Sequence, residues 1–499
     1  MNLKYTTTRL DNSYITSSQA ILKGLGDDGG LYLPLVIPKI NIEELSDMLK
    51  MTYNQKALII LSKYLTDFSQ EELKFCIDNA YNSSTFSSPK VTPLHILNNK
   101  FGVLELYHGP TSAFKDIALQ ILPYLLTASA KKNDDKRTYV ILVATSGDTG
   151  KAALEGFKNV PNTKILVYYP SDGVSLIQKL QMITQLGDNV KVIAVEGNFD
   201  DTQNGVKELF SSTDLNSKLE KINHTFSSAN SINWGRLVPQ IVYYFDSYTQ
   251  LVNSKNIKIG DKINFTVPTG NFGNILAGYF AKQMGLPINK FICATNSNDV
   301  LNDFIKTGEY NRNRTFMKTL SPSMDILISS NLERLLFLLS DGDKELIANL
   351  MLELKNKGSY KISNKILVSL QDAFYSDSAN DLETLNTIKE TYEKFGYLID
   401  THTAVAYKVY EKYLRVTNDH TFNIIVSTAS PYKFNEAVAK AILPNYLELD
   451  DIEQLKAIHE TTKSPIPNGL IGLDKKNIRF KDTITKDKME ETLKEYLNI

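Results

Sequence analysis

The feature that most constrains the fold of this chain is a repeated alternation between short β-branched runs and helical periods. Such an alternation is typical of βα units, which assemble around parallel sheets. The runs that we expect to form buried strands are Tyr139–Val143, Lys164–Tyr168, Val190–Ala194, Asn264–Val267 and Asn423–Val426. Between the second and third runs, apolar residues at helical spacing predict a crossover helix: Leu176, Ile177, Leu180, Ile183 and Leu186. The sequence therefore predicts an α/β protein with open parallel sheets.

The chain is long enough for more than one domain. It has 499 residues, whereas a single hydrophobic core stops growing near ~250–300 residues. A polar run at 82–89 marks a boundary, so residues 1–90 are expected to form an N-terminal α/β extension. We assign 91–135 and 255–499 to a large domain, with added helices at 300–400. Residues 136–254 are expected to form a small domain.

Charge and cysteine content exclude several classes of function. Lys and Arg number 55 against 56 for Asp and Glu, so the net charge of -1 creates no field that would attract nucleic acid or a membrane surface. Two cysteines are too few for a disulfide-stapled secreted protein. No stretch approaches the ~18 apolar residues of a membrane helix, and the six histidines form no metal-binding pattern. We expect a cytoplasmic protein without nucleic-acid, membrane or metal partners.

Two loops lie between a predicted strand and a helical pattern. Gly270-Asn271-Phe272-Gly273-Asn274 would gather backbone N–H groups at a helix N-terminus, where the dipole favours an anion, and its glycines allow positive φ. This pattern predicts a phosphate cup, with an ordinary tight turn as an equal alternative from these residues alone. The second loop, residues 144–151, lacks the glycine spacing of a nucleotide P-loop. Its hydroxyl groups suit a smaller anion such as a carboxylate, or they cap the helix through Ser146 or Asp148.

Two further segments carry reactive or hydroxyl side chains. Lys115 stands where a helical pattern begins, and the positive end of a helix dipole disfavours an ammonium group. Only the neutral amine attacks a carbonyl, although a lysine taken alone is usually a solvated surface group. Ser427 and Thr428 end a late strand. They either face the crevice at the carboxyl ends of the strands or simply terminate the strand before Pro431.

In this order, the four loops resemble the fold type II (tryptophan synthase β-like) family of pyridoxal-phosphate (PLP) enzymes. The amino-acid sequences of these motifs resemble those of the threonine synthases. The resemblance extends over nearly the whole chain. Its segments also include Tyr5–Arg9, Asp28–Tyr32, Thr92–Leu94, His108–Asp116, Thr145–Gly150, Asn230–Arg236, His402–Val405 and Ser427–Phe434.

The resemblance assigns roles to individual residues. It makes Lys115 the catalytic residue, joined to PLP as an imine, and it makes Thr428, with Ser427 nearby, the partner of the pyridine nitrogen. The residues expected to hold the cofactor phosphate are Gly270, Asn271, Phe272, Gly273 and Asn274. Those expected to bind the substrate are Thr145, Ser146, Asp148, Thr149, Asn230, Ser231 and Arg236. Asp148 departs from the asparagine with which related enzymes touch the cofactor's 3-oxygen; Thr401 and Ser430 also depart from the usual Pro and His.

The implied activity is a lyase reaction of threonine biosynthesis that converts O-phospho-L-homoserine and water to L-threonine and phosphate. A second anion site ending at Arg236 favours this reaction, because a dehydratase or cysteine synthase has no phosphate on its substrate. The alternatives are a phospho-lyase that releases a keto acid, a serine/threonine dehydratase and a non-catalytic metabolite-binding protein. We expect a monomer or homodimer.

Overall fold

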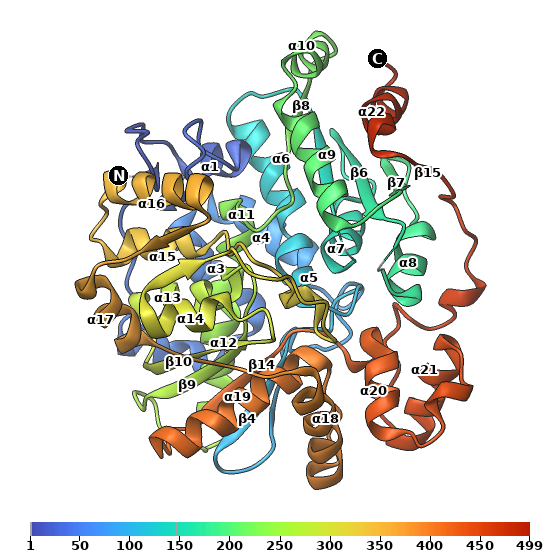
Figure 1. Cartoon of the computed structure of the whole chain (residues 1–499). Coiled ribbons are helices and arrows are strands. Elements are labelled where there is room, and N and C mark those ends of the chain that lie inside the picture. Colours follow the sequence, from blue (N-terminus) through green and yellow to red (C-terminus); the bar gives the residue numbers. More distant parts are fainter. Residues whose placement is uncertain (1, 146, 173) are drawn as a thin grey trace.

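Two separate sheets form the frame of the chain, as the computed structural model shows (Figure 1). The structure describes residues 2–145, 147–172 and 174–499, without the side chain of Asp200. The strand order of the larger sheet is β13 (Phe374–Ser378), β10 (Ile288–Thr295), β9 (Ile263–Pro268), β14 (Asn423–Ser427), β4 (Phe101–Glu105) and β3 (Leu94–Ile96). That of the smaller sheet is β15 (Thr483–Ile484), β7 (Val190–Val195), β6 (Thr163–Pro170), β5 (Thr138–Ala144) and β8 (His224–Ser227). Apart from the antiparallel edge strand β3, the paired strands run parallel.

Both sheets are covered on their two faces, which explains why their strands are continuous apolar runs. The helices packed on the larger sheet include α12 (Gln240–Asn253), α13 (Gly273–Met284) and α19 (Thr401–Thr417). Those on the smaller sheet include α7 (Asp148–Phe157), α8 (Leu176–Ile183), α9 (Phe199–Ser211), α10 (Thr213–Lys221) and α22 (Met489–Leu497). In β5, Ile141 and Val143 join the core on one face, while Val140 and Leu142 join the core on the other. The period of two along the strand thus supplies two cores.

Residues near the start of the chain pack on the larger-sheet side. They contain β1 (Tyr5–Thr7), α1 (Ser17–Lys23), β2 (Tyr32–Pro34), α2 (Ile42–Asp47), α3 (Tyr53–Tyr64) and α4 (Gln70–Ala80). Lys56 of α3 forms a buried ion pair with Asp246 of α12 at 2.7 Å. The rings of Tyr5 and Tyr64 each meet Trp234 edge-on at 5.6 Å between centroids. These contacts fix the segment to α12 and to α11 (Trp234–Leu237).

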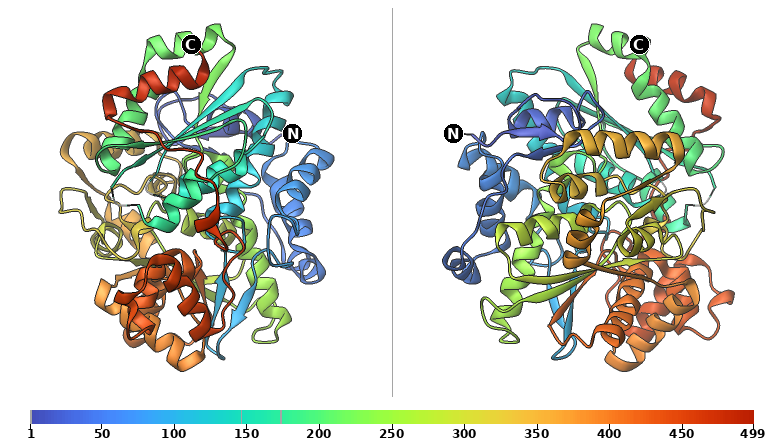
Figure 2. Two further views of the ribbon diagram at one scale, coloured as in Figure 1. Left: turned by 90° about the vertical axis from the view of Figure 1, so that its right-hand side faces the viewer. Right: turned by 60° about the vertical axis from the view of Figure 1, so that its left-hand side comes forward.

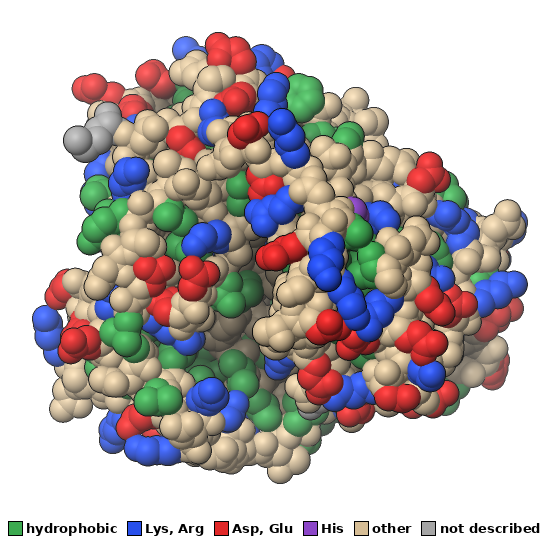
Figure 3. Space-filling view, turned by 90° about the horizontal axis from the view of Figure 1, so that it is seen from above, with side chains coloured by type: hydrophobic (Ala, Val, Ile, Leu, Met, Phe, Trp, Pro, Cys, Tyr) green, Lys and Arg blue, Asp and Glu red, His purple; other side chains and the backbone are tan. Residues whose placement is uncertain are grey.

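Added helices surround the larger sheet, as the sequence predicts for residues 300–400. They are α14 (Val300–Thr307), α15 (Leu332–Leu339), α16 (Lys344–Lys357), α17 (Asn364–Ala373) and α18 (Asp381–Phe395), followed later by α20 (Asn435–Ile442) and α21 (Asp451–Thr462). On the face seen in Figure 3, acidic and basic side chains are interspersed. No helix within the described residues is long and apolar enough to cross a membrane.

All five predicted strands form, but three expectations need correction. The crossover helix α8 ends at Ile183, so Leu186 lies beyond it and is 66% exposed. The segment 255–499 does not belong wholly with the larger sheet, because β15 pairs with β7 and α22 completes the core on that face (Figure 2). Nor does the segment 136–254 belong wholly with the smaller sheet, because α12 packs on the larger sheet. The rest of the expected division into domains remains a prediction.

Candidate active site

Lys115 is held beside the loop that follows β14. It is the first residue of α5 (Lys115–Leu119), and the backbone just before it is bonded to that loop. The Phe114 N–H donates to the Thr428 carbonyl at 2.8 Å, and the Ser430 N–H donates to the Ser112 carbonyl at 3.0 Å. The structure therefore brings Lys115 and Thr428 together, although they are far apart in sequence.

The Lys115 amine lies in a largely dry setting. Its side chain is 14% exposed, and its Nζ is 3.9 Å from Asp148 Oδ2. Burial lowers the pKa of Lys115 to about 8; the Asp148 carboxylate opposes this, while Lys433 and Arg236 reinforce it. The sequence attributes the shift to the helix start, but burial is the larger cause in the structure.

The loop from β9 to α13 forms the expected turn, but with a different residue in the left-handed conformation. Phe272 has φ 61°, whereas neither Gly270 nor Gly273 has a positive φ, which corrects the reason given for the two glycines. Gly270 is needed for close approach: a Cβ there would lie 3.1 Å from the Ser323 carbonyl oxygen. The Phe272 ring is buried against Phe374, at 5.6 Å between centroids. This packing offsets the cost of the unusual backbone.

The N-terminus of α13 has the donors that an anion requires. No side chain caps it, so the N–H groups of its first turn are available. Asn274 Oδ1 accepts from the hydroxyls of Tyr243 and Tyr244 at 2.7 and 2.9 Å. Its Nδ2 is buried and has no partner among the described residues. Asn271 is exposed, and its carbonyl accepts from the Asn331 N–H. This end of the helix fits a phosphate group.

A buried guanidinium group lies on α11, which packs against α13. Arg236 is 3% exposed and has no acidic partner in the part of the chain that the structure describes. One of its N–H groups donates to the Ala229 carbonyl, while Nε has no acceptor there. Burial lowers the pKa of Arg236 to about 10. A buried cation without a counterion is a ready partner for an anionic ligand.

The segment before Arg236 connects it to the cup. Ser231 Oγ accepts from Asn331 Nδ2 at 3.2 Å, and a Cβ built on Gly273 would lie 3.8 Å from the Ser231 Cβ. Asn230 is exposed, and the hydrogen bonds that the structure gives it involve its backbone. Ser231 therefore lies against the cup, and α11, which carries Arg236, packs on α13.

In the hydroxyl-rich loop after β5, one hydroxyl group bonds the backbone of the same segment. Thr145 Oγ1 accepts from the N–H groups of Gly147 and Gly150, both at 3.0 Å. Thr149 is half-buried, and Ser146 lies outside the described residues. Thr145, which precedes α7, thus accepts from an N–H group in the first turn of that helix.

Asp148 is already surrounded by donors of this chain. Its Oδ1 accepts from Lys433 Nζ at 2.7 Å and from Gln178 Nε2 at 2.9 Å, and its Oδ2 accepts from Ser323 Oγ at 3.2 Å. Burial acts to raise its pKa, but Lys433 and Lys115 hold the pKa of this carboxyl below its ordinary value. Asp148 is therefore an ionised internal anchor beside Lys115.

The two hydroxyls after β14 differ in their surroundings. Ser427 Oγ is 2.8 Å from Thr403 Oγ1, which also donates to Asp400. The Thr428 side chain is buried, and none of the described residues forms a hydrogen bond with its hydroxyl. Thr428 is thus the better placed of the two to bond an external ring nitrogen.

Three residues that support the site lie outside the sequence-based predictions. Lys433 contacts Asp148, Ser323 bridges Asp148 to the Gly270 turn, and Arg334 donates to the Asn331 side chain at 2.5 Å. Of these three, only Lys433 could have been found from the sequence. It is the single charged residue in Ser427–Phe434, a segment that carries the family resemblance.

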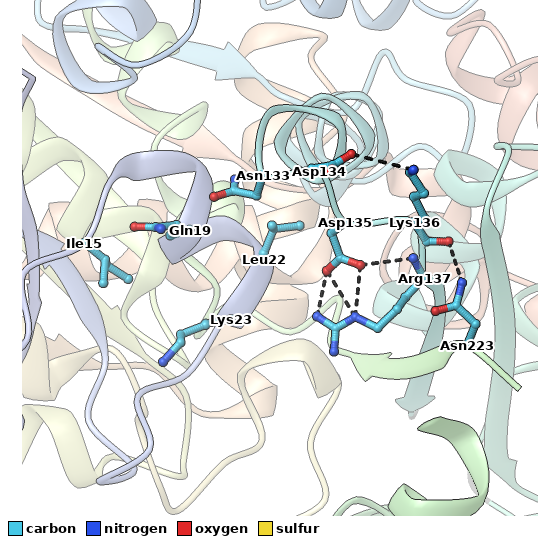
Figure 4. A pocket seen from close by; sticks show the side chains of 10 residues that line it. All are labelled: Ile15, Gln19, Leu22, Lys23, Asn133, Asp134, Asp135, Lys136, Arg137 and Asn223. Atoms are coloured by element: carbon cyan, nitrogen blue, oxygen red, sulfur yellow. Dashed lines mark hydrogen bonds and ion pairs between the residues drawn. The ribbon is translucent and has the colours of Figure 1, made fainter. Parts of the chain in front are cut away.

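A separate surface pocket of about 630 Å³ opens beside α1 (Figure 4). It contains none of the predicted site residues, and most of its charged side chains are paired, as Arg137 is with Asp135 at 2.6 Å. Within residues 2–145, 147–172 and 174–499, no group of three His, Cys, Asp or Glu side chains could hold a metal ion.

The fold and the site define the class of protein. They are those of a pyridoxal-phosphate-dependent enzyme, and the family profile with that description matches residues 87–427. The profiles described as threonine synthase N terminus and threonine synthase, C-terminal match residues 4–81 and 403–495. The chain belongs to the threonine synthase family.

Individual proteins agree with this membership. The threonine synthase of Saccharomyces cerevisiae is 39% identical over 491 residues, which cover 92% of this chain and 94% of that protein. The PLP-bound threonine synthase of Brucella melitensis is 36% identical, with a TM-score of 0.87 over 99% of both chains. Human threonine synthase-like 1 is 40% identical over 90% of this chain, but the chain spans only 59% of that protein's length.

The observed donors fit the PLP cofactor of this family. The buried Lys115 amine can bond its carbonyl carbon, and the uncapped α13 N-terminus with the unpaired Asn274 amide can hold its phosphate.

Proposed function

We propose that the chain converts O-phospho-L-homoserine and water to L-threonine and phosphate. The observation that carries this proposal is the buried Arg236 guanidinium, which has no acidic partner among the described residues and follows a segment whose Ser231 lies against the cup. One anion site would serve the cofactor and the second would serve a phosphorylated substrate.

The residues near Lys115 would divide the binding of the cofactor. When bound, PLP supplies a carbonyl carbon for amines and a ring that withdraws electrons from the substrate's α-carbon. Gly270 to Asn274 would hold its phosphate, and the Thr428 hydroxyl would bond its ring nitrogen. A neutral hydroxyl does not keep that nitrogen protonated as a carboxylate would. With its amine free, Lys115 would act as the base.

The same residues account for the movement of protons and phosphate. Lys115 would remove the α-proton and later return it, since its lowered pKa of about 8 leaves part of it neutral near pH 7. Arg236 would hold the phosphate as its bond to the γ-carbon breaks, and water would add at the β-carbon. Thr149, with Thr145 and Ser146 of the same loop, would bind the substrate carboxylate, and Asn230 would complete the phosphate site.

The decisive experiment is incubation of the PLP-loaded protein with O-phospho-L-homoserine. Threonine and phosphate in equal amounts are expected. Phosphate with 2-oxobutanoate and ammonia would instead identify a phospho-lyase, and turnover of serine or threonine without need of a phosphorylated substrate would identify a dehydratase.

We also infer a cytoplasmic enzyme that acts as a monomer or homodimer on small molecules rather than on nucleic acid or membranes. Its two cysteines, Cys76 and Cys293, are free and buried, which suits a reducing compartment. Sedimentation of the purified protein would decide between monomer and dimer.

A further inference from the structure

The Asp148 carboxylate lies between Lys433 and Lys115, and it is closer to Lys433. Its Oδ1 is 2.7 Å from Lys433 Nζ, within hydrogen-bond distance, whereas its Oδ2 is 3.9 Å from Lys115 Nζ. The Lys433 side chain is 0% exposed and the Asp148 side chain is 4% exposed. A carboxylate this deeply buried requires a cation, and Lys433 supplies it.

Lys433 also ties together the segments that form the site. It belongs to η3 (Pro431–Phe434), which follows the loop of Thr428. Besides bonding Asp148 of α7, its Nζ donates to the Thr111 carbonyl at 2.9 Å. Thr111 in turn donates through its N–H and hydroxyl to Asp116, the residue after Lys115. One ammonium group therefore links the smaller-sheet helix α7 to the loop that carries Lys115.

The charges around Lys115 make the position of Asp148 important. Four groups act on it electrostatically: Asp148 from α7, Lys433 from η3, Arg236 from α11 and Asp116 from its own helix. Asp148 is the acidic group with the larger effect. If it turned fully toward Lys115, the two would form a closed ion pair and the amine would stay protonated.

We propose that Lys433 is a positioning residue whose ammonium group balances and orients the Asp148 carboxylate, so that Asp148 does not form a closed ion pair with Lys115. The inference rests on the proposed function only in taking Lys115 as the residue that bonds PLP. Lys433 thereby keeps the amine available to a carbonyl carbon.

The test is the pH dependence of Lys115 reactivity in the full-length, PLP-free chain. Reductive methylation with formaldehyde and cyanoborohydride, followed by mass spectrometry of the Lys115 peptide, reports the neutral amine. Lys433→Met removes the charge at similar length, and we expect it to raise the midpoint by about one pH unit, so that methylation at pH 7 slows about tenfold. Lys433→Arg, which keeps the charge, is expected to restore most of the wild-type profile.

Further variants separate this role from general damage to the fold. Asp148→Asn is expected to lower the midpoint, and the double variant Lys433→Met/Asp148→Asn to return it toward the wild-type value. Lys56→Met is the matched control, since it also strands a buried carboxylate, Asp246, which is not among the charged groups that act on Lys115. It should leave the Lys115 midpoint unchanged.

The outcomes are decisive in either direction. An unchanged midpoint in Lys433→Met, or an equal shift in Lys433→Arg, overturns the inference. If Lys433→Met does not fold, Asp148→Asn decides, because an unchanged or higher midpoint there contradicts the assigned role of Asp148. Failure of the proposed function is seen separately, as wild-type protein that releases no threonine from O-phospho-L-homoserine whatever the midpoints are.

Discussion

Replacing Arg236 with methionine should separate stability from activity. Burial lowers the pKa of this guanidinium from 12.5 to about 10, which corresponds to a cost of about 3 kcal/mol for keeping the charge in the folded, ligand-free chain. Methionine fills similar space without that cost, but it gives up the hydrogen bond to the Ala229 carbonyl, worth about 1–3 kcal/mol. The ligand-free variant is therefore expected to be as stable as the wild type or slightly more stable.

Activity should respond in the opposite way. A buried guanidinium–phosphate contact is worth about 3–5 kcal/mol when one partner is removed, so kcat/KM for O-phospho-L-homoserine should fall about 10²- to 10⁴-fold. The assay pairs this rate with thermal unfolding of the PLP-loaded protein, with and without inorganic phosphate. Phosphate binding to the substrate site should raise the wild-type Tm but not that of Arg236→Met, because only a bound ligand adds stability.

Two results would refute this reasoning. One is a variant that unfolds several degrees earlier than the wild type in the absence of phosphate, since Arg236 would then be a structural residue. The other is a variant that keeps threonine formation within tenfold of the wild type. Lysine at the same position is a useful comparison, because it keeps the charge but loses the planar geometry that matches a phosphate.

Three further predictions follow from the residues around Lys115. Lys115→Ala should abolish the borohydride-reduced PLP adduct and lower threonine formation by at least about 10²- to 10⁴-fold, the usual contribution of a general base; an adduct that persists in peptide mapping would contradict the assignment. In the wild type, the rate at which PLP attaches covalently should rise with pH to a midpoint near 8, because burial lowers the pKa of Lys115 to about 8 and only the neutral amine reacts; a profile that still rises at pH 10 would rule this out. Gly156→Ala would place a Cβ 2.0 Å from the Leu119 carbonyl oxygen and should force α7 away from α5, with loss of PLP absorbance and a lower Tm. The control is Gly396→Ala, where no atom lies within 4 Å, so the variant should lose only about 1–2 kcal/mol of stability from the positive φ. If Gly156→Ala is destabilised no more than Gly396→Ala, α5 and α7 do not need this contact.

The central strands of both sheets could be predicted from the sequence because their residues are buried on both faces of the sheet. A run such as Val140 to Val143 places alternate side chains in two different cores, so the whole run has to be apolar. Leu186 was misassigned because an apolar residue at helical spacing carries no information about where the helix ends. The pairing of β15 with β7 joins residues far apart in sequence through only two residues, too few for a pattern.

The site was predictable where a local motif carries it and not where tertiary contacts do. Glycines and asparagines between β9 and α13 mark the cup, yet the left-handed residue is Phe272, whose conformation depends on burial of its ring against Phe374. The ion pair of Asp148 with Lys433 joins two different layers of the fold, and neither residue alone indicates it.

The attachment of β15 and α22 to the smaller sheet has a consequence for how the chain is made. Residues 483–497 are synthesised long after β7, so the edge of β7 and the apolar face beneath α22 stay open to water until the ribosome has passed them. The larger sheet is completed earlier, once β14 is made. The half of the protein that carries Asp148 is thus the last to close, and during synthesis its apolar surface stays exposed longest.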